Sequence, residues 1–599
     1  MRSRWRGWCV AGLLTTHALL VGWSAARHSP VVDEMGHLPA GISHWQFRQF
    51  TLYKVNPPLV RMAAAVPTVF ARPKTEWLAF SADPLARPEF FLGEAFIEVN
   101  GTRAFDLFTW ARWACLPFTV LGGWACYRWA RSLHGDGAGL LAAALWCTCP
   151  NVIGYAQLIV PDLGAAAVGL VACWVFRRWL ATASWRNAML AGLLLGAAQL
   201  TKFTLLILVP LWPALWVAVR LGDAGFRSPR EIGRQLAQLA FLAVLGVWVI
   251  NVGYAFEGAG ERLGEFRFVS DAFSGPAGKH DLDAPAVNRF TGSRWGALPV
   301  PLPRNYVLGI DRQKLDLETK WWSYLRGEWR MGGWWYYYLY ALAVKVPLGT
   351  WLLAAVALAA AASSQVYRRH WQEEIQLLVP IAAVLALVSS QTGFNHHLRY
   401  VLPIFPFAFI AISRLGRAFE GRQPVLAGGV AVLLGCSAAS SLWAYPHGLS
   451  YFNELAGGPR NGYKHLAHSN TDWGQDVLLL KQWVDRHPEA RPFALAMDIM
   501  PVIQSTLGLP SLLPTVGPAS DPPPHPAQLV GPYPGWYAVS VNRLYDRRNE
   551  YTYFRRYEPV ARAGYSIHVY HLSLEEANRG RRELGLPELI PRPKDSGPQ

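Results

Sequence analysis

The polar loops and the C-terminal tail of this sequence contain no cysteine. All seven cysteines fall inside apolar runs, at positions 9, 115, 126, 147, 149, 173 and 436. We therefore expect no disulfide and no thiolate metal site. Charged residues are also scarce, at 16% of 599 residues, and the basic ones form no dense run although the net charge is +16. This distribution favours positive charge that orients a membrane protein over a nucleic-acid partner.

Long apolar runs, by contrast, are abundant. The chain is 52% apolar, carries 28 tryptophans and has a mean hydropathy of +0.15, a composition typical of polytopic membrane proteins. A hydrocarbon layer about 30 Å thick needs about 20 apolar residues per helix. The sequence predicts about eleven transmembrane helices, near residues 7–25, 107–127, 138–157, 159–176, 187–201, 203–219, 236–254, 336–360, 375–391, 400–413 and 424–444.

Every second connection between these runs is short and basic. The arginines concerned are Arg2, Arg4, Arg6, Arg128, Arg131, Arg177, Arg178, Arg186, Arg220, Arg227, Arg230, Arg234, Arg368, Arg369, Arg414, Arg417 and Arg422. The positive-inside rule assigns such connections to the cytoplasm. The first run could instead be a cleaved signal, because Ser24-Ala25-Ala26 offers small residues. Residue 33 lies outside in either case.

The alternation assigns the remaining segments to the outer face. They include a first loop at 26–106, a large loop at 255–335 and everything after residue 445. Alternating stretches such as WYAVSVNRL and YSIHVYHL are strand-like. We therefore predict a membrane domain at 1–444, a small soluble α/β domain at 445–575, and a tail at 576–599 whose Pro-rich end is disordered.

The unusual polar residues of the chain collect on this predicted outer face. They are Asp33, Glu34, Asp162, Lys202, His396, His397 and Arg399. Ionisable groups at membrane depth are costly, so each is a functional hypothesis. Structural interpretations stay open for several: Asp33-Glu34 as a solvated loop pair or a cap, Asp162 as a helix N-cap, and Lys202 as a lysine that reaches for the interface. Arg399, by contrast, offers a planar fork suited to phosphate.

Proline positions suggest two short interfacial helices in the first outer loop. Because proline is tolerated in the first turn of a helix, we expect one helix from Pro39 to about Phe50. Asn56 is typical of an N-cap, with Pro57 opening a second helix that stops at Pro67. Further along, SNTDWGQDVLLLKQWV (469–484) predicts a helix capped by Asp472 or Asn470. Asp281-Leu282-Asp283 forms a D-x-D pattern, which we interpret as a coincidence in a loop.

Taken together, DEMGH…NPPL, LIVPD, LTKF and HHLRYVLPIFP resemble motifs of the GT-C glycosyltransferases. The similarity runs over about residues 1–415. It is greatest to the protein O-mannosyltransferase and aminoarabinose (lipid A) transferase group, the phospholipid-carrier-dependent, family 39-like enzymes. The resemblance implies a GT-C fold in an α-helical polytopic membrane protein, with interfacial juxtamembrane helices. It also implies transfer of a sugar from a polyprenyl phosphate at the outer face, with a bacterial inner membrane as the expected location.

The same resemblance suggests roles for individual residues. Asp33 would be the general base of an inverting displacement, with Glu34 and His37 holding Asp33 or the acceptor. Lys202, Arg399, His396 and His397 would bind the donor phosphate, with Asp162 and Asn56 in support, and no metal cofactor is expected. Relatives often carry His or Lys just before Pro-Pro, whereas this chain has Asn56, which adds no positive charge. The acceptor stays open among a protein, a glycan and a lipid head group.

Two other classes of protein account for the sequence less well. A transporter or flippase of lipid-linked saccharide should show internal repeats and ionisable residues near the bilayer midplane. We find no repeat, and the charged residues sit at the edges of the apolar runs. A membrane anchor that displays a binding domain would not need polar residues spread over five loops.

Overall fold

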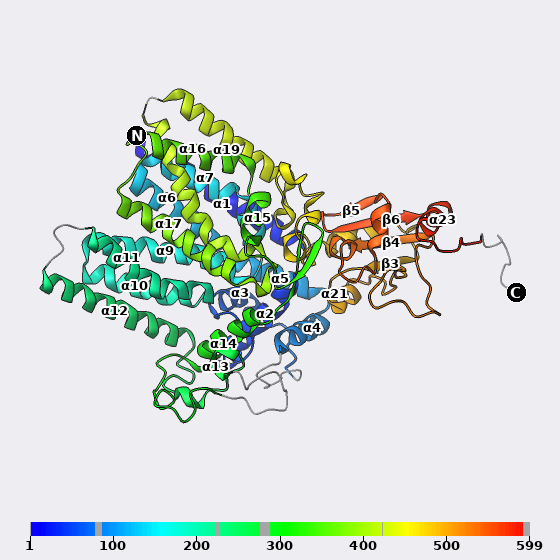
Figure 1. Cartoon of the computed structure of the whole chain (residues 1–599), viewed down its shortest axis with the longest axis horizontal. Helices are drawn as coiled ribbons and strands as arrows, with labels where there is room; N and C mark the ends of the chain where they lie inside the picture. The colour runs from blue at the N-terminus through cyan, green and yellow to red at the C-terminus, as the bar shows by residue number, and fades with distance from the viewer. Residues whose placement is uncertain (1, 78–86, 223–227, 276–287, 422, 591–599) are drawn as a thin grey trace.

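The structure is a computed structural model that describes every residue except 1, 78–86, 223–227, 276–287, 422 and 591–599. A large helical body comprises most of the chain, and a smaller mixed part, orange to red in Figure 1, carries the C-terminus. The prediction of an α-helical polytopic membrane protein is confirmed. The D-x-D pattern at 281–283 lies outside the described residues.

In the described part of the chain, seven helical segments are long and apolar enough to cross a membrane. Two bent helix pairs raise the number to nine if each pair is one span. The straight segments are α1 (Arg2–Arg27), α9 (Pro161–Thr182), η1 with α11 (Phe203–Leu221), α12 (Pro229–Gly253), α17 (Trp371–Ser390), η4 to η5 (Leu398–Phe419) and α19 (Pro424–Ala444). The bent pairs are α7 (Asp136–Thr148) with α8 (Pro150–Ala156), and α15 (Tyr337–Lys345) with α16 (Leu348–Ser363).

The prediction of eleven spans exceeds this number by two. The run near 107–127 is divided between α5 (Arg103–Ala114) and α6 (Leu116–His134), and the charges of Arg128 and Arg131 lower the mean hydropathy of α6. The run near 187–201 forms α10 (Trp185–Gln199), whose 15 residues are too few for a full crossing. Both runs are helical, and they fall outside the count because of their length and polarity.

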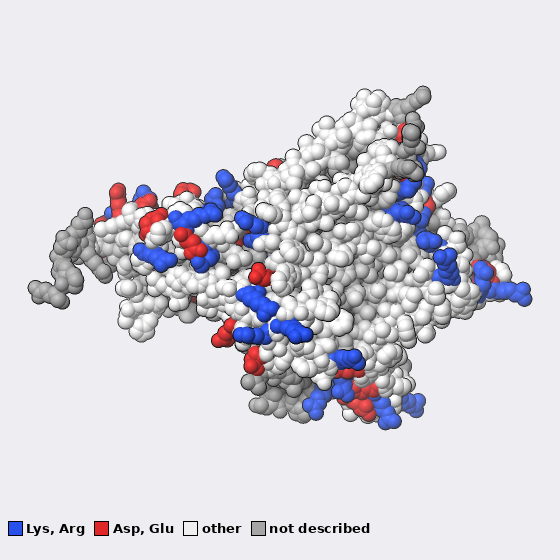
Figure 2. Space-filling view, turned by 180° about the vertical axis from the view of Figure 1, so that it is seen from behind, with Lys and Arg blue, Asp and Glu red and all other residues white. Residues whose placement is uncertain are grey.

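The two ends of the helical body differ in their polar residues. Several basic connections meet at one end, where Arg6 pairs with Asp136, Arg177 with Glu373 (3.1 Å) and Arg414 with Glu374 (2.8 Å). We call this the basic end. Helix α9 begins at the other end with Asp162 and is about 33 Å long at 1.5 Å per residue. Figure 2 shows a broad area without charged side chains between charged ends, as a bilayer-spanning surface requires.

Three helices of the first loop differ from the sequence-based expectation. Helix α2 spans Val32–Phe47, so Pro39 lies inside it. The helix starts seven residues earlier than predicted, where the Glu34 carboxylate accepts a hydrogen bond from the Val31 N–H (2.9 Å). Helix α3 spans Leu59–Phe70, so Asn56 precedes it and Pro67 does not end it. Helix α4 (Pro88–Asn100) packs across α2. The predicted starts at Pro39 and Pro57 and the predicted stop at Pro67 are therefore wrong.

The large loop contributes α13 (Asp271–Ser274), α14 (Arg304–Glu318) and a hairpin of β1 (Trp322–Leu325) and β2 (Glu328–Met331). After α19 the chain forms a four-stranded sheet in the order β3-β4-β6-β5, with β3 parallel to β4 and the other pairs antiparallel. Its strands are β3 (Phe493–Ala496), β4 (Gly535–Ser540), β5 (Ala561–Ala563) and β6 (Ile567–Leu572). Helices α20 (Val477–Arg486), α21 (Pro501–Thr506), α22 (Val541–Leu544) and α23 (Leu574–Glu583) accompany the sheet.

Two predictions for the C-terminal part need correction. Helix α20 begins after Asp476 rather than near residue 470, because Asp472 instead accepts hydrogen bonds from the Gly474 N–H (2.9 Å) and the Ser540 hydroxyl. Helix α23, which a capping box at Ser573 starts, runs from Leu574 to Glu583 and so crosses the predicted domain boundary at residue 575. Residues 591–599 of the end predicted to be disordered lie outside the described residues.

Close packing of α4 on α2 leads to a stability prediction. A Cβ atom built on Gly93 would lie 2.4 Å from the Met35 carbonyl oxygen of α2. Gly93→Ala should therefore destabilise the protein by about 1–3 kcal/mol through overpacking. Gly428→Ala in α19 is the control, because nothing lies within 4 Å of its added methyl group. Thermal unfolding in detergent measures both variants, and equal midpoints would contradict the close contact.

Candidate active site

Seven of the nine candidate residues line one cavity of about 620 Å³ at the end of the body opposite the basic end. They are Asp33, Asn56, Asp162, Lys202, His396, His397 and Arg399. The volume falls within the range of about 300–1,000 Å³ that is usual for small-molecule sites. Glu34 and His37 are not among the lining residues.

Four interruptions of helical structure bring the charged members together. Asp33 lies in the first turn of α2, and Asp162 follows Pro161 at the start of α9. Lys202 has an extended backbone between α10 and η1 (Phe203–Ile207), and Arg399 lies in the 3-10 segment η4 (Leu398–Ile404). Because helices start or break at this level, their polar side chains reach one space at the edge of the apolar layer.

The four charged side chains form one network. Arg399 Nη2 lies 2.8 Å from Asp33 Oδ2, and its Nη1 lies 3.7 Å from Asp162 Oδ2. Lys202 Nζ pairs with the other oxygen of Asp162. All four side chains are at most 20% exposed, so each charge depends on its partner in a poorly hydrated space. The network therefore holds two carboxylates and two cations within contact distance.

Aromatic rings complete the surroundings of the two cations. Lys202 Nζ lies 4.5 Å from the centre of the Tyr400 ring, and the Arg399 guanidinium lies 4.4 Å from that of Trp473. Such cation–π contacts fix a cation without neutralising it. Both cations therefore remain able to attract an anion that enters the cavity.

His396 and His397, which we expected to bind the donor phosphate, line the cavity as uncharged rings. Burial lowers the pKa of His396 to about 3 and that of His397 well below its usual range, and Arg399 adds to the effect at His397. Both rings are therefore neutral near pH 7. His396 Nε2 donates to the Trp322 carbonyl (2.5 Å), and His397 Nδ1 contacts the Ser469 hydroxyl. They can hydrogen-bond a phosphate but add no charge to the cavity.

Glu34 has a position different from the one expected of a residue that holds Asp33. Its carboxylate is fully buried and bonded to Arg112 Nε (2.8 Å) and Nη2 (2.5 Å), with further bonds from the Val31 and Ile159 N–H groups. Arg112 also donates to the carbonyls of Ala25, His28 and Ser29. The pair fixes the chain between α1 and α2, so we correct the role of Glu34 to a structural one.

His37 is also removed from the cavity surface. Its ring lies against Tyr53, with 4.4 Å between ring centres, and burial lowers its pKa well below the usual range. Tyr53 itself lines the cavity, so His37 supports the wall from behind. The expected contact of His37 with Asp33 or an acceptor is therefore not made.

Sequence reasoning missed part of the cavity wall. The missed polar and aromatic residues are Tyr53, Arg87, Phe90, Gln313, Asp316, Trp321, Trp322, Trp329, Phe394, Tyr400, His468, Asp546 and Arg547. They come from the two large loops, from η4 and its approach, and from the segment after residue 445. Only Tyr400 had a usable signal, since it follows Arg399 directly. The others carry no local pattern that separates a cavity wall from an interfacial belt.

No trio of cavity residues in the described part of the chain has the spacing of a metal site. The one group with that spacing there is His28, His447 and Asp476, which does not line the cavity. Its residues join the end of α1 to the segment after α19 and the start of α20.

Comparison with known proteins agrees with the motifs. Residues 97–250 match a family model described as dolichyl-phosphate-mannose-protein mannosyltransferase. The predicted resemblance to GT-C glycosyltransferases is confirmed. No curated protein matches the chain.

Solved structures are similar to the chain at low sequence identity. ArnT from Cupriavidus metallidurans bound to undecaprenyl phosphate is 13% identical, with 94% of this chain and 97% of that chain covered and a TM-score of 0.39. The protein O-mannosyltransferase Pmt1-Pmt2 complex of S. cerevisiae bound to the sugar donor is 11% identical, with 80% of this chain and 92% of that chain covered and a TM-score of 0.48. The Archaeoglobus fulgidus oligosaccharyltransferase in complex with Zn and sulfate is 13% identical, with 72% of this chain and 53% of that chain covered and a TM-score of 0.38.

The buried pair of Glu34 and Arg112 leads to a second prediction. Arg112→Ala should destabilise the protein by about 3–5 kcal/mol, because it leaves the Glu34 carboxylate buried without its partner. Glu34→Gln should also lower the unfolding midpoint while the remaining folded protein keeps its activity. The exposed pair of Arg234 and Glu231 (2.7 Å) is the control, since removing such a pair costs about 1 kcal/mol or less. A folded but inactive Glu34→Gln variant would instead support the expected contact of Glu34 with Asp33 or the acceptor.

Proposed function

We propose that this chain is a membrane glycosyltransferase that moves a sugar from a polyprenyl-phosphate donor to a hydroxyl acceptor. The observation that carries the proposal is the single cavity shared by a carboxylate, Asp33, and two cations, Lys202 and Arg399. Sugar transfer from a lipid phosphate needs a base for the acceptor and positive charge for the departing phosphate. The family match over residues 97–250 supports the same reaction class.

The donor phosphate binds between Lys202 and Arg399. Both cations are paired with carboxylates in the structure, at 2.8 Å for Arg399 and Asp33. A phosphate presents more oxygens than a carboxylate and suits the planar fork of Arg399. On this proposal the incoming phosphate displaces Asp33 from Arg399 and takes its place. Donor binding thus prepares the base as well as the leaving group.

The released Asp33 carboxylate then acts on the acceptor. It takes the proton of the acceptor hydroxyl while the hydroxyl oxygen forms a bond to the anomeric carbon. The bond from that carbon to the phosphate oxygen breaks, and the lipid phosphate leaves with the electron pair. Lys202 and Arg399 stabilise the charge that grows on this phosphate, and attack from the opposite side inverts the anomeric configuration. The residues present supply each of these roles without a metal ion.

The acceptor enters past the aromatic side of the cavity. Trp321, Trp322 and Trp329 line this side with His468 and Arg547, which follow α19 in the chain. Flat aromatic faces and polar groups suit a sugar or a peptide hydroxyl. The acceptor is therefore a protein, a glycan or a lipid head group that reaches the cavity from the side of the C-terminal domain.

On the same proposal the cavity opens on the outer face of the membrane, with the bacterial inner membrane as the location. Support comes from the basic end, where Arg6, Arg177 and Arg414 gather at the opposite end of the bundle. The residues after 445 then form an extracytoplasmic domain. The alternative of a transporter or flippase of lipid-linked saccharide gains no support from the family match.

Replacing the base gives the first test of this function. Asp33→Asn should lower kcat by about 10²–10⁴-fold, because positioned proton removal contributes that much. Donor affinity should stay equal or increase, since asparagine competes less well for Arg399. Purified protein is incubated with a panel of polyprenyl-phosphate sugars, and mass spectrometry identifies the donor consumed and the product. Asp106→Asn, an exposed site on α5, is the control. Wild-type transfer by Asp33→Asn would remove the base assignment.

Replacing the guanidinium of Arg399 gives the second test. Arg399→Lys keeps the charge but loses the bidentate contact, so donor affinity should fall about 10- to 100-fold. Arg414→Lys is a matched control, because Arg414 is as buried as Arg399 (7% and 8% exposed side chains) and binds Glu374 at the basic end. Equilibrium binding of a labelled polyprenyl phosphate measures both. An equal loss of affinity in the two variants would contradict the phosphate clamp.

A further inference from the structure

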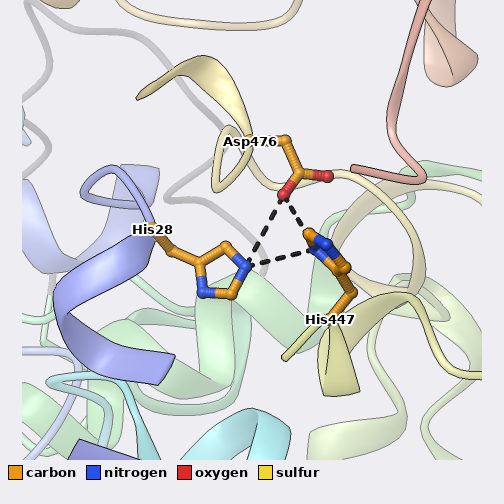
Figure 3. A group of neighbouring side chains, drawn as sticks. All are labelled: His28, His447 and Asp476. Carbon is orange, nitrogen blue, oxygen red and sulfur yellow. Dashed lines mark hydrogen bonds and ion pairs between the residues drawn. The ribbon is translucent and has the colours of Figure 1, made fainter. Parts of the chain in front are cut away.

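The structure brings together two imidazoles and a carboxylate at a point that the proposed transfer reaction does not use. His28 follows α1, His447 follows α19, and Asp476 immediately precedes α20. Figure 3 shows the three side chains pointing toward one another from these separate segments. They do not line the cavity that holds Asp33 and Arg399. Their convergence therefore needs an explanation of its own.

The three inward atoms form a small triangle. His28 Nε2 lies 3.3 Å from His447 Nδ1 and 3.7 Å from Asp476 Oδ1, and the third side measures 3.4 Å. Tetrahedral zinc with bonds of about 2.0–2.1 Å separates its ligand atoms by about 3.3 Å. An octahedral ion with bonds of similar length would bring neighbouring ligand atoms to about 2.9 Å. The triangle thus matches three corners of a tetrahedron better than a face of an octahedron.

Hydrogen bonds behind the ligands fix their orientation. His28 Nδ1 lies 2.9 Å from the Ser24 carbonyl and 3.0 Å from Gln157 Oε1, so this nitrogen carries the proton. The lone pair of Nε2 then points into the triangle. Asp476 Oδ2 accepts bonds from the Ser566 hydroxyl (2.8 Å) and from two backbone N–H groups. Outer contacts of this kind accompany metal-binding histidines and carboxylates in proteins.

The inner carboxylate oxygen makes the case for a cation. Asp476 is fully buried, and its Oδ1 faces the two imidazoles at 3.4 Å and 3.7 Å, with no hydrogen bond of good geometry among the described residues. A buried carboxylate oxygen without a partner is costly. A neutral His28 has no proton on Nε2 to give it, because the proton lies on Nδ1. With Nδ1 of His28 protonated, the 3.3 Å contact is a hydrogen bond from His447 Nδ1 to His28 Nε2. One cation at the centre would take the place of that proton and bind the oxygen and both nitrogens together.

We propose that His28, His447 and Asp476 bind one Zn²⁺ ion, with water as the fourth ligand. Two imidazoles and one carboxylate form a donor set that suits zinc. The His447 side chain is 17% exposed, whereas those of His28 and Asp476 are fully buried. Water can therefore reach the ion only from the side of His447. The proposal does not depend on the transferase reaction.

The ion would fasten the C-terminal domain to the membrane domain beside the base. The chain next to the triangle already pairs across this boundary, since the Ser29 N–H donates to the Gln475 carbonyl (2.9 Å). The Ser29 hydroxyl also donates to the Gly474 carbonyl (2.7 Å). Residue 28 precedes Asp33 by one short turn of chain. Zinc at this point would therefore limit movement of the segment that carries the base.

Metal content of the full chain tests the site. The protein is purified in detergent with a histidine-free tag, stripped with a chelator and titrated with Zn²⁺ or Mg²⁺. After gel filtration, mass spectrometry should find about one zinc per chain, and Zn²⁺ but not Mg²⁺ should raise the unfolding midpoint. Substitution by Co²⁺ should give the intense visible absorption of a tetrahedral site. Absence of zinc, or no change of the midpoint with zinc, would overturn the proposal.

Single variants locate the ion at these three residues. His28→Gln, His447→Gln and Asp476→Asn should each weaken zinc binding by at least about 10- to 100-fold, the loss that outer-contact changes alone cause. His525→Gln, an exposed histidine of the same domain, is the matched control and should retain the ion. Retention of zinc by the three variants would overturn the assignment. If a variant does not fold, the zinc and cobalt titrations of the unaltered chain still show whether the protein binds one tetrahedral zinc ion.

Discussion

The arrangement of this protein depends on one constraint, the mutual neutralisation of four charges at the edge of an apolar layer. Asp33, Asp162, Lys202 and Arg399 come from four segments far apart in sequence and meet within contact distance. Each charge alone would be costly at this depth, whereas the network leaves none without an opposite neighbour. On the proposed function, an anionic donor replaces a carboxylate at one of the two cations.

The segment after α19 shapes this network as well as covering it. Asn470 Oδ1 accepts a bond from the Leu398 N–H (3.0 Å), and its amide donates to the His396 carbonyl (2.7 Å). These bonds hold the backbone on either side of His397, two residues before Arg399. Trp473 then lies against the guanidinium. The C-terminal part is thus a component of the cavity, and its removal should alter Arg399 rather than merely expose it.

Sequence reasoning predicted the membrane class and the cavity members that are polar within apolar runs. Asp162, Lys202 and Arg399 were identifiable because a charge is rare in such surroundings. Glu34 is likewise a charged residue next to an apolar run, but it is there because it forms a buried ion pair with Arg112, 78 residues away. The sequence around Glu34 contains nothing that separates a buried ion pair from a reactive carboxylate. Tryptophans of the wall were missed because an interfacial belt has the same composition.

Helix boundaries failed wherever tertiary contacts outweighed proline. Pro39 was expected to open a helix and instead lies inside α2, and Pro67 was expected to close α3 but does not. A proline removes one N–H and leaves one carbonyl free, a local cost that a well-anchored helix tolerates. Helix α2 is anchored by Glu34 at its start and by α4, which packs closely against Met35 and Gly36. Neither anchor is visible in the local sequence.

Asn56 stands where relatives often carry a basic residue, and a nearby arginine supplies a positive charge from another position. The resemblance led us to expect a basic residue before Pro57, and asparagine cannot supply its charge. In the structure, however, the Arg61 guanidinium from the first turn of α3 donates to the Asn56 carbonyl and lies 4.9 Å from the centre of the Tyr53 ring. Arg61 is buried, and its Nε and Nη1 have no partner among the described residues. A positive charge thus lies behind this corner of the cavity, where Tyr53 and Asn56 line the wall, and it comes from a residue five positions after Asn56.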